Sequence, residues 1–293
     1  MIAIDWGTSS FRAYRIGAGG KVLDRRSAPR GILTVEGGAF AEVLAAEVAD
    51  WGAEPGPVLM SGMIGSRQGW REVPYLDCPA DPAALARACG EVRWGEGRRA
   101  LIVPGLTCRD RHGVPDVMRG EETQILGALG TTGATATVCL PGTHSKYASL
   151  INGHIEGFET HMTGEVFGVL WRHSILGRLG GTGEVADMAA FEAGVDRAGQ
   201  DQGLLHHVFG VRARGLFGEM PAESLASYLS GILIGHEIRA ATRAGPVAVI
   251  GAPELSALYR RAFQRLGIEA SVVPGEPAAA GLWRIAEIMG AAA

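Results

Sequence analysis

The sequence predicts an α/β protein of two similar domains with a cleft between them. Three observations lead to this prediction. Patterns typical of strands and of amphipathic helices alternate along the whole chain. A unit of three strands joined by two turns occurs once in each half. The length of 293 residues fits one large domain or two smaller ones, and the hydrophobic fraction of 47% fits a well-packed globular protein.

The first half begins with the three-strand unit. Alternating and apolar runs predict its strands at residues 1–5, 11–16 and 21–26, with turns at 7–10 and 17–20. Phe40, Val43, Leu44 and Val48 recur at helical spacing and predict a helix over 39–51. The remaining elements predicted here are strands at 58–60 and 100–103 and helices at 81–89 (N-cap Asp81) and 120–129.

The second half begins with the same unit. Its strands are predicted at 137–140, 146–151 and 154–159, and Gly-Thr-x-Ser occurs in both first turns at an offset of 135 residues. The same offset aligns Ala13 with Ala148 and Ile16 with Ile151. This agreement predicts a duplication, with domains at 1–134 and 135–293. The terminal segment 277–293 could pack back on the first domain.

The rest of the second half is mainly helical. The predicted elements are helices at 163–175, 188–193, 225–243, 255–266 and 277–289 and strands at 247–250 and 270–273. Residues 176–220 as a whole match no pattern with an assignable role. His206 and His207, within this stretch, lack further metal ligands at suitable spacing and are predicted to lie on the surface.

Composition excludes several functions. The 27 basic and 31 acidic residues give a net charge of −4, whereas binding to a nucleic-acid backbone requires a basic surface. No apolar run reaches the roughly 18 residues of a transmembrane helix, and residues 1–7 lack the basic start of a secretory signal. We therefore expect a cytoplasmic protein without nucleic-acid or membrane partners. Its cysteines are predicted to be reduced, partly buried thiols: Cys78, Cys89, Cys108 and Cys139.

The first turn of each unit has the composition of a phosphate-binding loop. Gly7, Thr8, Ser9 and Ser10 offer backbone N–H groups and hydroxyls, and Asp5 ends the preceding strand. An aspartate at this point can hold a hydrated Mg²⁺. A plain hairpin turn would have the same sequence, so the interpretation depends on the second copy of the turn.

The second copy supplies Gly142, Thr143, His144, Ser145 and the cation Lys146. His144 could donate to a phosphate oxygen, and Lys146 could equally be a structural surface lysine. Further along the chain, the strand at 247–250 runs into a turn that contains Gly251, Ala252 and Glu254. Small residues at such a turn allow a planar base and its ribose to approach closely. Viewed alone, this segment fits an ordinary strand-to-helix turn equally well. Together the three segments predict a nucleotide site.

In this order the three segments resemble the two phosphate motifs and the adenosine motif of the sugar kinase/heat-shock protein/actin superfamily. Four segments narrow the resemblance to the 2-dehydro-3-deoxygalactonokinase family: residues 5–14, 60–70, 118–124 and 140–146. It covers nearly the whole chain. The resemblance implies two actin-like, ribonuclease H-like domains and ATP-dependent phosphorylation of 2-dehydro-3-deoxy-D-galactonate to its 6-phosphate, in galactose catabolism.

Phosphoryl transfer to a hydroxyl needs a carboxylate to accept or orient the proton. Asp116, Glu121 and Glu122 precede the second domain, where related enzymes place this group. Glu121 is the first choice and Glu122 the second, although both would also suit a helix N-terminus. Asp5 is the metal-linked carboxylate.

The sugar acid implied by the resemblance carries a carboxylate that needs cationic donors. Arg67 is the first choice, followed by Arg12 and Arg119, although each could form an ordinary surface ion pair. Trp6 and Trp70 fit either a pocket wall or the core. The remaining substrate-binding candidates lie in the loop at 61–70 that contains Arg67. They are its small or polar residues and the tryptophan that ends it: Ser61, Gly62, Gly65, Gln68 and Trp70.

Two other functions stay open at this point. A phosphoanhydride hydrolase of the exopolyphosphatase type also carries a Glu-Glu pair before its second domain. A non-catalytic nucleotide-dependent sensor would not need the polar loop at 61–70. The sequence also leaves the oligomeric state open, a homodimer included, and the choice between the galactonate and gluconate epimers.

Overall fold

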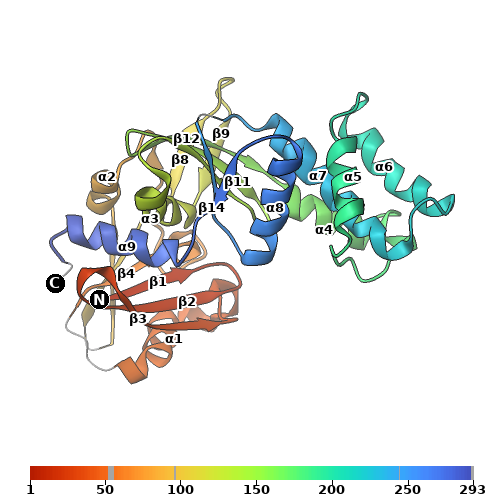
Figure 1. Cartoon of the computed structure of the whole chain (residues 1–293). Coiled ribbons are helices and arrows are strands. Elements are labelled where there is room, and N and C mark those ends of the chain that lie inside the picture. Colours follow the sequence, from red (N-terminus) through yellow and green to blue (C-terminus); the bar gives the residue numbers. More distant parts are fainter. Residues whose placement is uncertain (52–55, 96, 244, 292–293) are drawn as a thin grey trace. The chain divides into compact units, whose positions relative to one another are not determined.

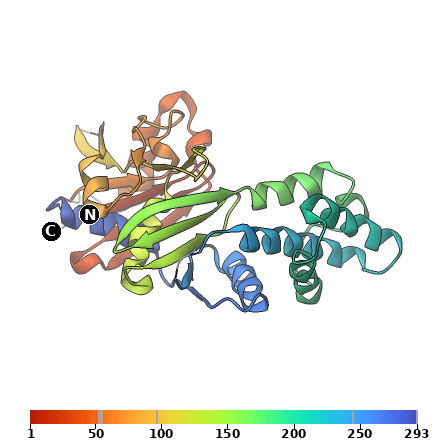
Figure 2. The same cartoon turned by 90° about the horizontal axis from the view of Figure 1, so that it is seen from above.

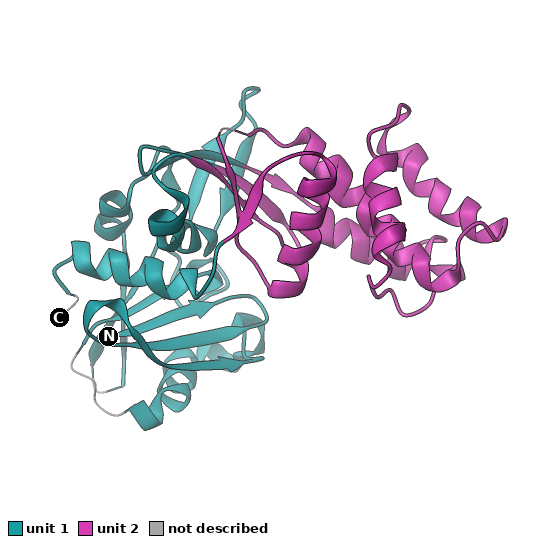
Figure 3. Cartoon of the chain, viewed as in Figure 1, with its two compact units in different colours: residues 1–135, 149–158, 273–293 teal, residues 136–148, 159–272 magenta. Residues whose placement is uncertain are grey.

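The computed structural model describes residues 1–51, 56–95, 97–243 and 245–291, shown in two views in Figures 1 and 2. The chain forms two compact units, coloured in Figure 3. Unit 1 comprises Met1–Thr135, Ser149–Phe158 and Val273–Ala293, and unit 2 comprises Ala136–Ala148 and Glu159–Val272. Residues 149–158 thus group with unit 1 and not with the second predicted domain. Residues 292 and 293 of the predicted terminal segment lie outside the described residues.

Unit 1 is built on a six-stranded sheet of order β3-β2-β1-β4-β7-β6. Strand β1 runs antiparallel to β2 and parallel to β4, and β4 runs parallel to β7. All four residues of β4 are buried, as expected of a central parallel strand covered on both faces. The strands are β1 (Ile2–Trp6), β2 (Phe11–Ile16), β3 (Val22–Ala28), β4 (Val58–Ser61), β6 (Gly90–Trp94) and β7 (Arg98–Ile102).

The alternation along β1 separates a core face from a site face. Ile2, Ile4 and Trp6 join the apolar core beneath helix α1 (Phe40–Glu47). Because successive side chains point to opposite faces, Asp5 projects to the other face. Helix α9 (Pro277–Ile288) packs along that other face, against β1, β4 and helix α3 (Glu121–Thr132).

Helices α3 and α9 cross with their backbones in contact (Figure 1). A Cβ added at Gly127 of α3 would lie 1.8 Å from the carbonyl oxygen of Pro277. A Cβ added at Gly281 of α9 would lie 1.8 Å from the carbonyl oxygen of Thr123. The crossing therefore requires glycine on both helices.

A second, three-stranded sheet of order β5-β8-β9 completes unit 1. It consists of β5 (Leu76–Asp77), β8 (Leu106–Arg109) and β9 (Pro115–Met118), none of which was predicted from the sequence. Strand β6 was also missed. Helix α2 (Pro82–Arg87) confirms the predicted cap, because the Asp81 carboxylate accepts a hydrogen bond from the backbone N–H of Ala84 at 2.6 Å.

Unit 2 is built on a five-stranded sheet of order β12-β11-β10-β13-β14. The repeat strands thus occupy the same places as in unit 1, which confirms the predicted duplication in element order. Strands β10, β13 and β14 run parallel to one another. The boundary between the units crosses β11 and β12. The strands are β10 (Ala136–Leu140), β11 (Ser145–Ile151), β12 (His154–His161), β13 (Val247–Val249) and β14 (Ala270–Val272).

The helices of unit 2 pack in two apolar clusters. One, which contains Phe191 and Phe263, lies against the sheet, and the other joins helices α4 to α7 around Leu229 and Ile232. Figures 1 and 2 show α4 to α7 gathered at one end of the unit. The helices are α4 (Thr163–His173), α5 (Met188–Arg197), α6 (Gly203–Leu216), α7 (Leu225–Ala240) and α8 (Pro253–Arg265).

In residues 176–220 the structure adds one helix and corrects one prediction. The stretch contains helix α6, which the sequence did not indicate. His207 is fully buried and not on the surface, whereas His206 is exposed as expected. The ring of His207 contacts Nε2 of His236 at 2.9 Å and the carbonyl oxygen of Asp201 at 2.7 Å, and these two partners satisfy both of its nitrogens.

The other predicted strands and helices are confirmed, with boundaries shifted by a few residues. All four cysteines are free thiols, and Cys139 is the most buried of them. Within the described part of the chain, the helices are too short or too polar for any of them to cross a bilayer.

Gly281→Ala should destabilise the protein by about 1–3 kcal/mol or more, because the new methyl group overlaps the carbonyl oxygen of Thr123. The control is Gly130→Ala on α3, where a Cβ meets nothing within 4 Å. That change should stabilise the protein by about 0.5–1 kcal/mol through helix propensity. Urea unfolding measures both, and equal effects at the two positions would contradict the proposed constraint.

Candidate functional site

The first predicted phosphate turn lies at the carboxyl end of β1. The backbone N–H of Gly7 closes it by donating to the carbonyl oxygen of Ser10 at 2.9 Å, and Thr8 and Ser9 are exposed at its tip. The Asp5 carboxylate forms an ion pair with the exposed Arg12 at 3.2 Å. Burial raises the pKa of Asp5, and the Arg12 charge opposes this shift in part. Arg12 is thus a partner of Asp5 in this structure.

The two glutamates predicted as catalytic begin helix α3 and differ in environment. Glu121 is half-buried, and its carboxylate accepts a hydrogen bond from the backbone N–H of Arg119 at 3.0 Å. Glu122 is fully buried and accepts one from the N–H of Gly120 at 2.7 Å. Its other oxygen, Oε1, has no hydrogen-bond partner among the residues that the structure describes.

Burial makes Glu122 a weak acid. Its pKa rises from an ordinary value of 4.5 to about 8, chiefly through loss of solvation and further through the neighbouring Glu121. Glu122 is therefore mostly protonated at neutral pH. The two adjacent carboxyl groups are thus suited to different roles, because Glu121 alone is accessible to a substrate.

The loop after β4 lies against the start of α3. The fully buried Ser61 hydroxyl contacts the Thr123 hydroxyl at 3.2 Å, so this side chain is used in packing. Gly62 adopts a φ of 92°, and a Cβ there would come within 2.8 Å of the Trp6 carbonyl oxygen and 3.3 Å of the Asp5 carboxylate. The loop backbone can reach Asp5 only because residue 62 is glycine.

Arg119 is buried beneath the same loop. Its guanidinium donates to the carbonyl oxygen of Val73 at 2.8 Å and lies 4.3 Å from the centre of the Tyr75 ring. Nε and Nη1 have no hydrogen-bond partner in the described ranges. A Cβ at Gly65 would come within 2.8 Å of Nη1, so Gly65 and Arg119 occupy adjoining space.

The outer part of the loop is accessible. Arg67 and Gln68 are exposed, whereas Trp70 is half-buried and stacks on Phe40 at 6.3 Å between ring centres. Trp6 is fully buried in the core of unit 1, and its ring N–H donates to the Arg30 carbonyl oxygen at 2.8 Å. Trp6 was predicted to lie either in a pocket wall or in the core, and the structure places it in the core.

The second predicted phosphate turn lies at the carboxyl end of β10. Helix α4 packs closely beneath it, since a Cβ at Gly164 would lie 2.5 Å from the Gly142 carbonyl oxygen. His144 at the tip is exposed and bonds to the Glu165 carboxylate at 2.5 Å. Ser145 is fully buried, and Lys146 is 5% exposed, so neither is a free surface group.

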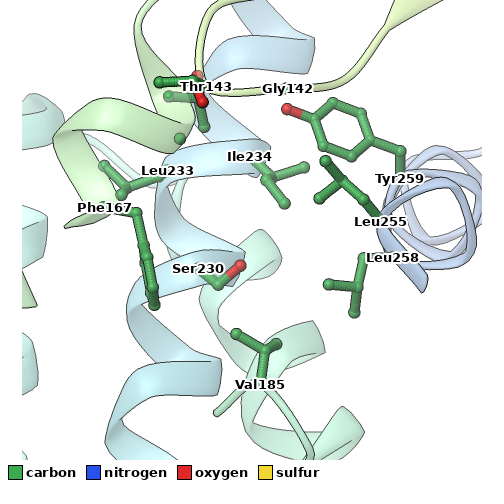
Figure 4. A pocket seen from close by; sticks show the side chains of 12 residues that line it. Gly142, Thr143, Phe167, Val185, Ser230, Leu233, Ile234, Leu255, Leu258 and Tyr259 are labelled. Atoms are coloured by element: carbon green, nitrogen blue, oxygen red, sulfur yellow. The ribbon is translucent and has the colours of Figure 1, made fainter. Parts of the chain in front are cut away.

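A cavity of about 310 Å³ opens beside this turn, entirely within unit 2 (Figure 4). The Gly142–Thr143 edge of the turn forms one side of it, and Leu255 and Leu258 of α8 form another. The lining is almost wholly apolar, with the Ser230 hydroxyl of α7 as one polar group. The other lining residues are Thr163, Gly164, Phe167, Val185, Leu233, Ile234 and Tyr259.

The predicted adenosine turn lies just outside this lining. Gly251, Ala252 and Glu254 are exposed before and at the start of α8, and the cavity is lined by residues further along that helix. The apolar face of α8 was predicted, but its role was not. For the α7 side, the signal available in the sequence was Ser230, a hydroxyl residue within the mostly apolar run at 228–234.

Each unit therefore carries a strand–turn–strand loop at the end of a buried central strand, and unit 2 adds a cavity beside its loop. This combination is that of an actin-like α/β fold, with a cavity beside one of two candidate phosphate-binding turns. Solved structures that are 11–14% identical to the chain have TM-scores of 0.50–0.52 and share the fold alone.

A sequence model of the 2-keto-3-deoxy-galactonokinase family matches residues 5–285, and the chain belongs to this family. It is 40% identical to a probable 2-dehydro-3-deoxygalactonokinase of Rhizobium meliloti (strain 1021), over 94% of this chain and 92% of the relative. It is 36% identical to the 2-dehydro-3-deoxygalactonokinase of Escherichia coli (strain K12), over 94% of each chain. A crystal structure assigned to the same activity, from Sinorhizobium meliloti, is 38% identical, with a TM-score of 0.89 over 98% of both chains.

Glu122→Gln should stabilise the protein increasingly as pH rises from 5 to 9. Between pH 4.5 and 8 the unfolded chain loses the Glu122 proton while the native state keeps it. The stability contributed by this group is therefore present at low pH and lost as pH rises. Each pKa unit corresponds to about 1.4 kcal/mol, so the variant should gain a few kcal/mol over the wild type across this range.

Urea unfolding at pH 5, 7 and 9 measures the difference. Glu36→Gln, at an exposed position, controls for the loss of a carboxylate as such. A pH-independent difference between the Glu122 variant and the wild type would show that Glu122 is not held protonated.

Proposed function

We propose that this chain transfers the γ-phosphoryl group of ATP to the 6-hydroxyl of 2-dehydro-3-deoxy-D-galactonate. The observation that carries the proposal is the family match over nearly the whole chain, with relatives of that name at 36–40% identity. The match favours a kinase over the hydrolase and sensor alternatives. The free cysteines support a cytoplasmic setting.

ATP binds to unit 2, with its base in the cavity beside the second turn. The apolar lining and the volume of about 310 Å³ suit a planar heterocycle, and Ser230 offers it one hydrogen-bonding group. The phosphates lie along the Gly142–Thr143 edge of the turn, where backbone N–H groups and the charge of Lys146 favour an anion.

The residues of the first turn are compatible with magnesium. Asp5 is a single carboxylate beside exposed Thr8 and Ser9, and Mg²⁺ keeps most of its waters and needs few protein oxygens. Asp5 would hold the ion through water, because Mg²⁺ gives up its hydration shell reluctantly. When bound, Mg²⁺ neutralises charge on the phosphates.

Glu121 is the catalytic base of the transfer. Its carboxylate takes the proton of the 6-hydroxyl as that oxygen forms a bond to the γ-phosphorus, and the bond from this phosphorus to the ADP oxygen breaks. Glu122 keeps its own proton and holds the start of α3 through Gly120.

The sugar-acid carboxylate binds at the loop after β4. Arg67 is exposed there and can reach a ligand, whereas Arg119 is buried and supports the loop through Val73 and Tyr75. Ser61, Gly62 and Gly65 shape the inner part of the loop, and Gln68 and Trp70 face its outer part.

A coupled ADP-release assay over a panel of 2-oxo-3-deoxy sugar acids tests the proposal. The galactonate derivative should give the highest kcat/KM, and its gluconate epimer gives the measure of selectivity. Release of orthophosphate without an acceptor would instead support the hydrolase, and absence of any turnover would support the sensor.

Glu121→Gln should lower kcat by about 10²–10⁴-fold, because it removes the base but keeps the size of the side chain. The KM values for ATP and for the sugar acid should change little. Glu47→Gln, on the α1 face of unit 1, is the matched control. Wild-type turnover by the Glu121 variant would show that this residue is not the base.

Arg67→Ala should raise KM for the sugar acid by about tenfold or more, since it removes a charged partner of the carboxylate. Arg67→Lys should recover part of this loss, because the charge is kept but the two-pronged geometry is not. Steady-state kinetics with ATP at saturation measures both variants. An unchanged KM in Arg67→Ala would place the carboxylate elsewhere.

A further inference from the structure

A chain of three buried polar groups lies under the second phosphate turn. The Ser145 hydroxyl and the Tyr259 hydroxyl are 2.8 Å apart, and the Tyr259 hydroxyl donates to Oε2 of Glu237 at 2.8 Å. The exposed fractions of the three residues are 0%, 1% and 4%. A tyrosine hydroxyl has one proton, and this one goes to Glu237, so Ser145 must be the donor to Tyr259.

The chain joins three separate elements of unit 2. Ser145 is the first residue of β11, directly after the turn, Tyr259 lies on α8, and Glu237 lies on α7. Burial raises the pKa of Glu237, and hydrogen bonds from Thr163 and Tyr259 oppose this shift. Glu237 also interacts electrostatically with Cys139 of β10, Tyr147 of β11 and His161 of β12.

Tyr259 also lines the cavity beside the turn. Figure 4 shows its hydroxyl directed toward the turn, with Leu255 and Leu258 of the same helix along the cavity wall. One side chain therefore contacts both the proposed base cavity and the end of the proposed phosphate turn. Removal of the Tyr259 hydroxyl would leave the buried Ser145 and Glu237 side chains each without their hydrogen bond to Tyr259. The turn would then lose this hydrogen-bonded link to α8.

We propose that Tyr259 is a positioning residue for the nucleotide, one that holds the 142–145 turn where it can bind phosphates. This inference rests on the proposed ATP site in unit 2. It also changes the role of Ser145, whose proton is committed to Tyr259 and not to a phosphate oxygen. The phosphate donors of the turn are then its backbone N–H groups and the Thr143 hydroxyl.

Tyr259→Phe tests the proposal, because it keeps the ring and removes only the hydroxyl. Affinity for a nonhydrolysable ATP analogue, measured by calorimetry, should fall about tenfold, as expected for the loss of one buried hydrogen bond. Affinity for adenosine, measured by ligand-observed NMR, should change less than about twofold, since adenosine needs no phosphate turn. KM for the sugar acid should not change.

Three further variants sharpen the test. Ser145→Ala removes the bond between Ser145 and Tyr259 from the other side. The double variant should therefore bind the ATP analogue no more weakly than Tyr259→Phe alone. Glu237→Gln keeps an acceptor for Tyr259 and should retain most of the ATP affinity. Tyr228→Phe, which removes the hydroxyl of another buried tyrosine of unit 2, is the matched control.

Unchanged affinity for the ATP analogue in Tyr259→Phe would overturn the inference, as would additive losses in the double variant or an equal loss for adenosine. If Tyr259→Phe does not fold, as judged by circular dichroism, the ratio of ATP-analogue to adenosine affinity in Ser145→Ala decides. A wild-type chain that binds adenosine but not the ATP analogue would overturn both this inference and the proposed function.

Discussion

The crossing of helices α3 and α9 fixes the place of the two glutamates in unit 1. Gly127 and Gly281 let the two backbones touch, so α3 cannot slide or rotate without a clash against α9. The first turn of α3 is thereby held against the loop after β4, where Gly62 lies next to Gly120. Helix α9 thus constrains where Glu121 and Glu122 lie at the start of α3.

The duplicated unit has diverged in a way that matches two different tasks. At the repeat offset, Asp5 corresponds to Leu140 and Arg12 to Tyr147. Unit 1 therefore ends its central strand in an ion pair exposed on one side, a setting for charged ligands. Unit 2 ends the same strand in apolar residues and places a cavity beside it. In the proposed function, the ion pair beside the first turn serves the metal, and the cavity beside the second turn serves the base of the nucleotide.

Local pattern was sufficient for most strands and helices, because each buries one face with a regular period. Local pattern failed for α6, where Leu205, Phe209 and Leu216 are exposed and obscure the apolar face. Strands β5, β8 and β9 were missed because they have only two to four residues each, and because β5 pairs with β8 across about 30 residues of sequence. His207 was misplaced for a similar reason, since its partner His236 lies 29 residues away.

The turns and the carboxylates of the site were predictable, since small residues and acidic pairs are visible in sequence. The surroundings of these turns and carboxylates could not be predicted. Leu258 and Ser230 join one cavity only through the packing of α7 against α8. The buried position of Arg119 likewise depends on Val73 and Tyr75, which lie some 45 residues earlier in the chain.

The difference in burial between Glu121 and Glu122 also depends on what surrounds them. Adjacent residues on a helix point in directions about 100° apart, so the two side chains meet different surroundings. One carboxyl group enters the interior and the other remains at the surface. Two charges this close would repel one another strongly in a poorly solvated setting. Burial prevents this, because it keeps a proton on Glu122 and so removes the like charge facing Glu121. A pair that looks redundant in the sequence thereby becomes one buried, protonated glutamate that anchors the start of the helix and one half-buried glutamate at its surface.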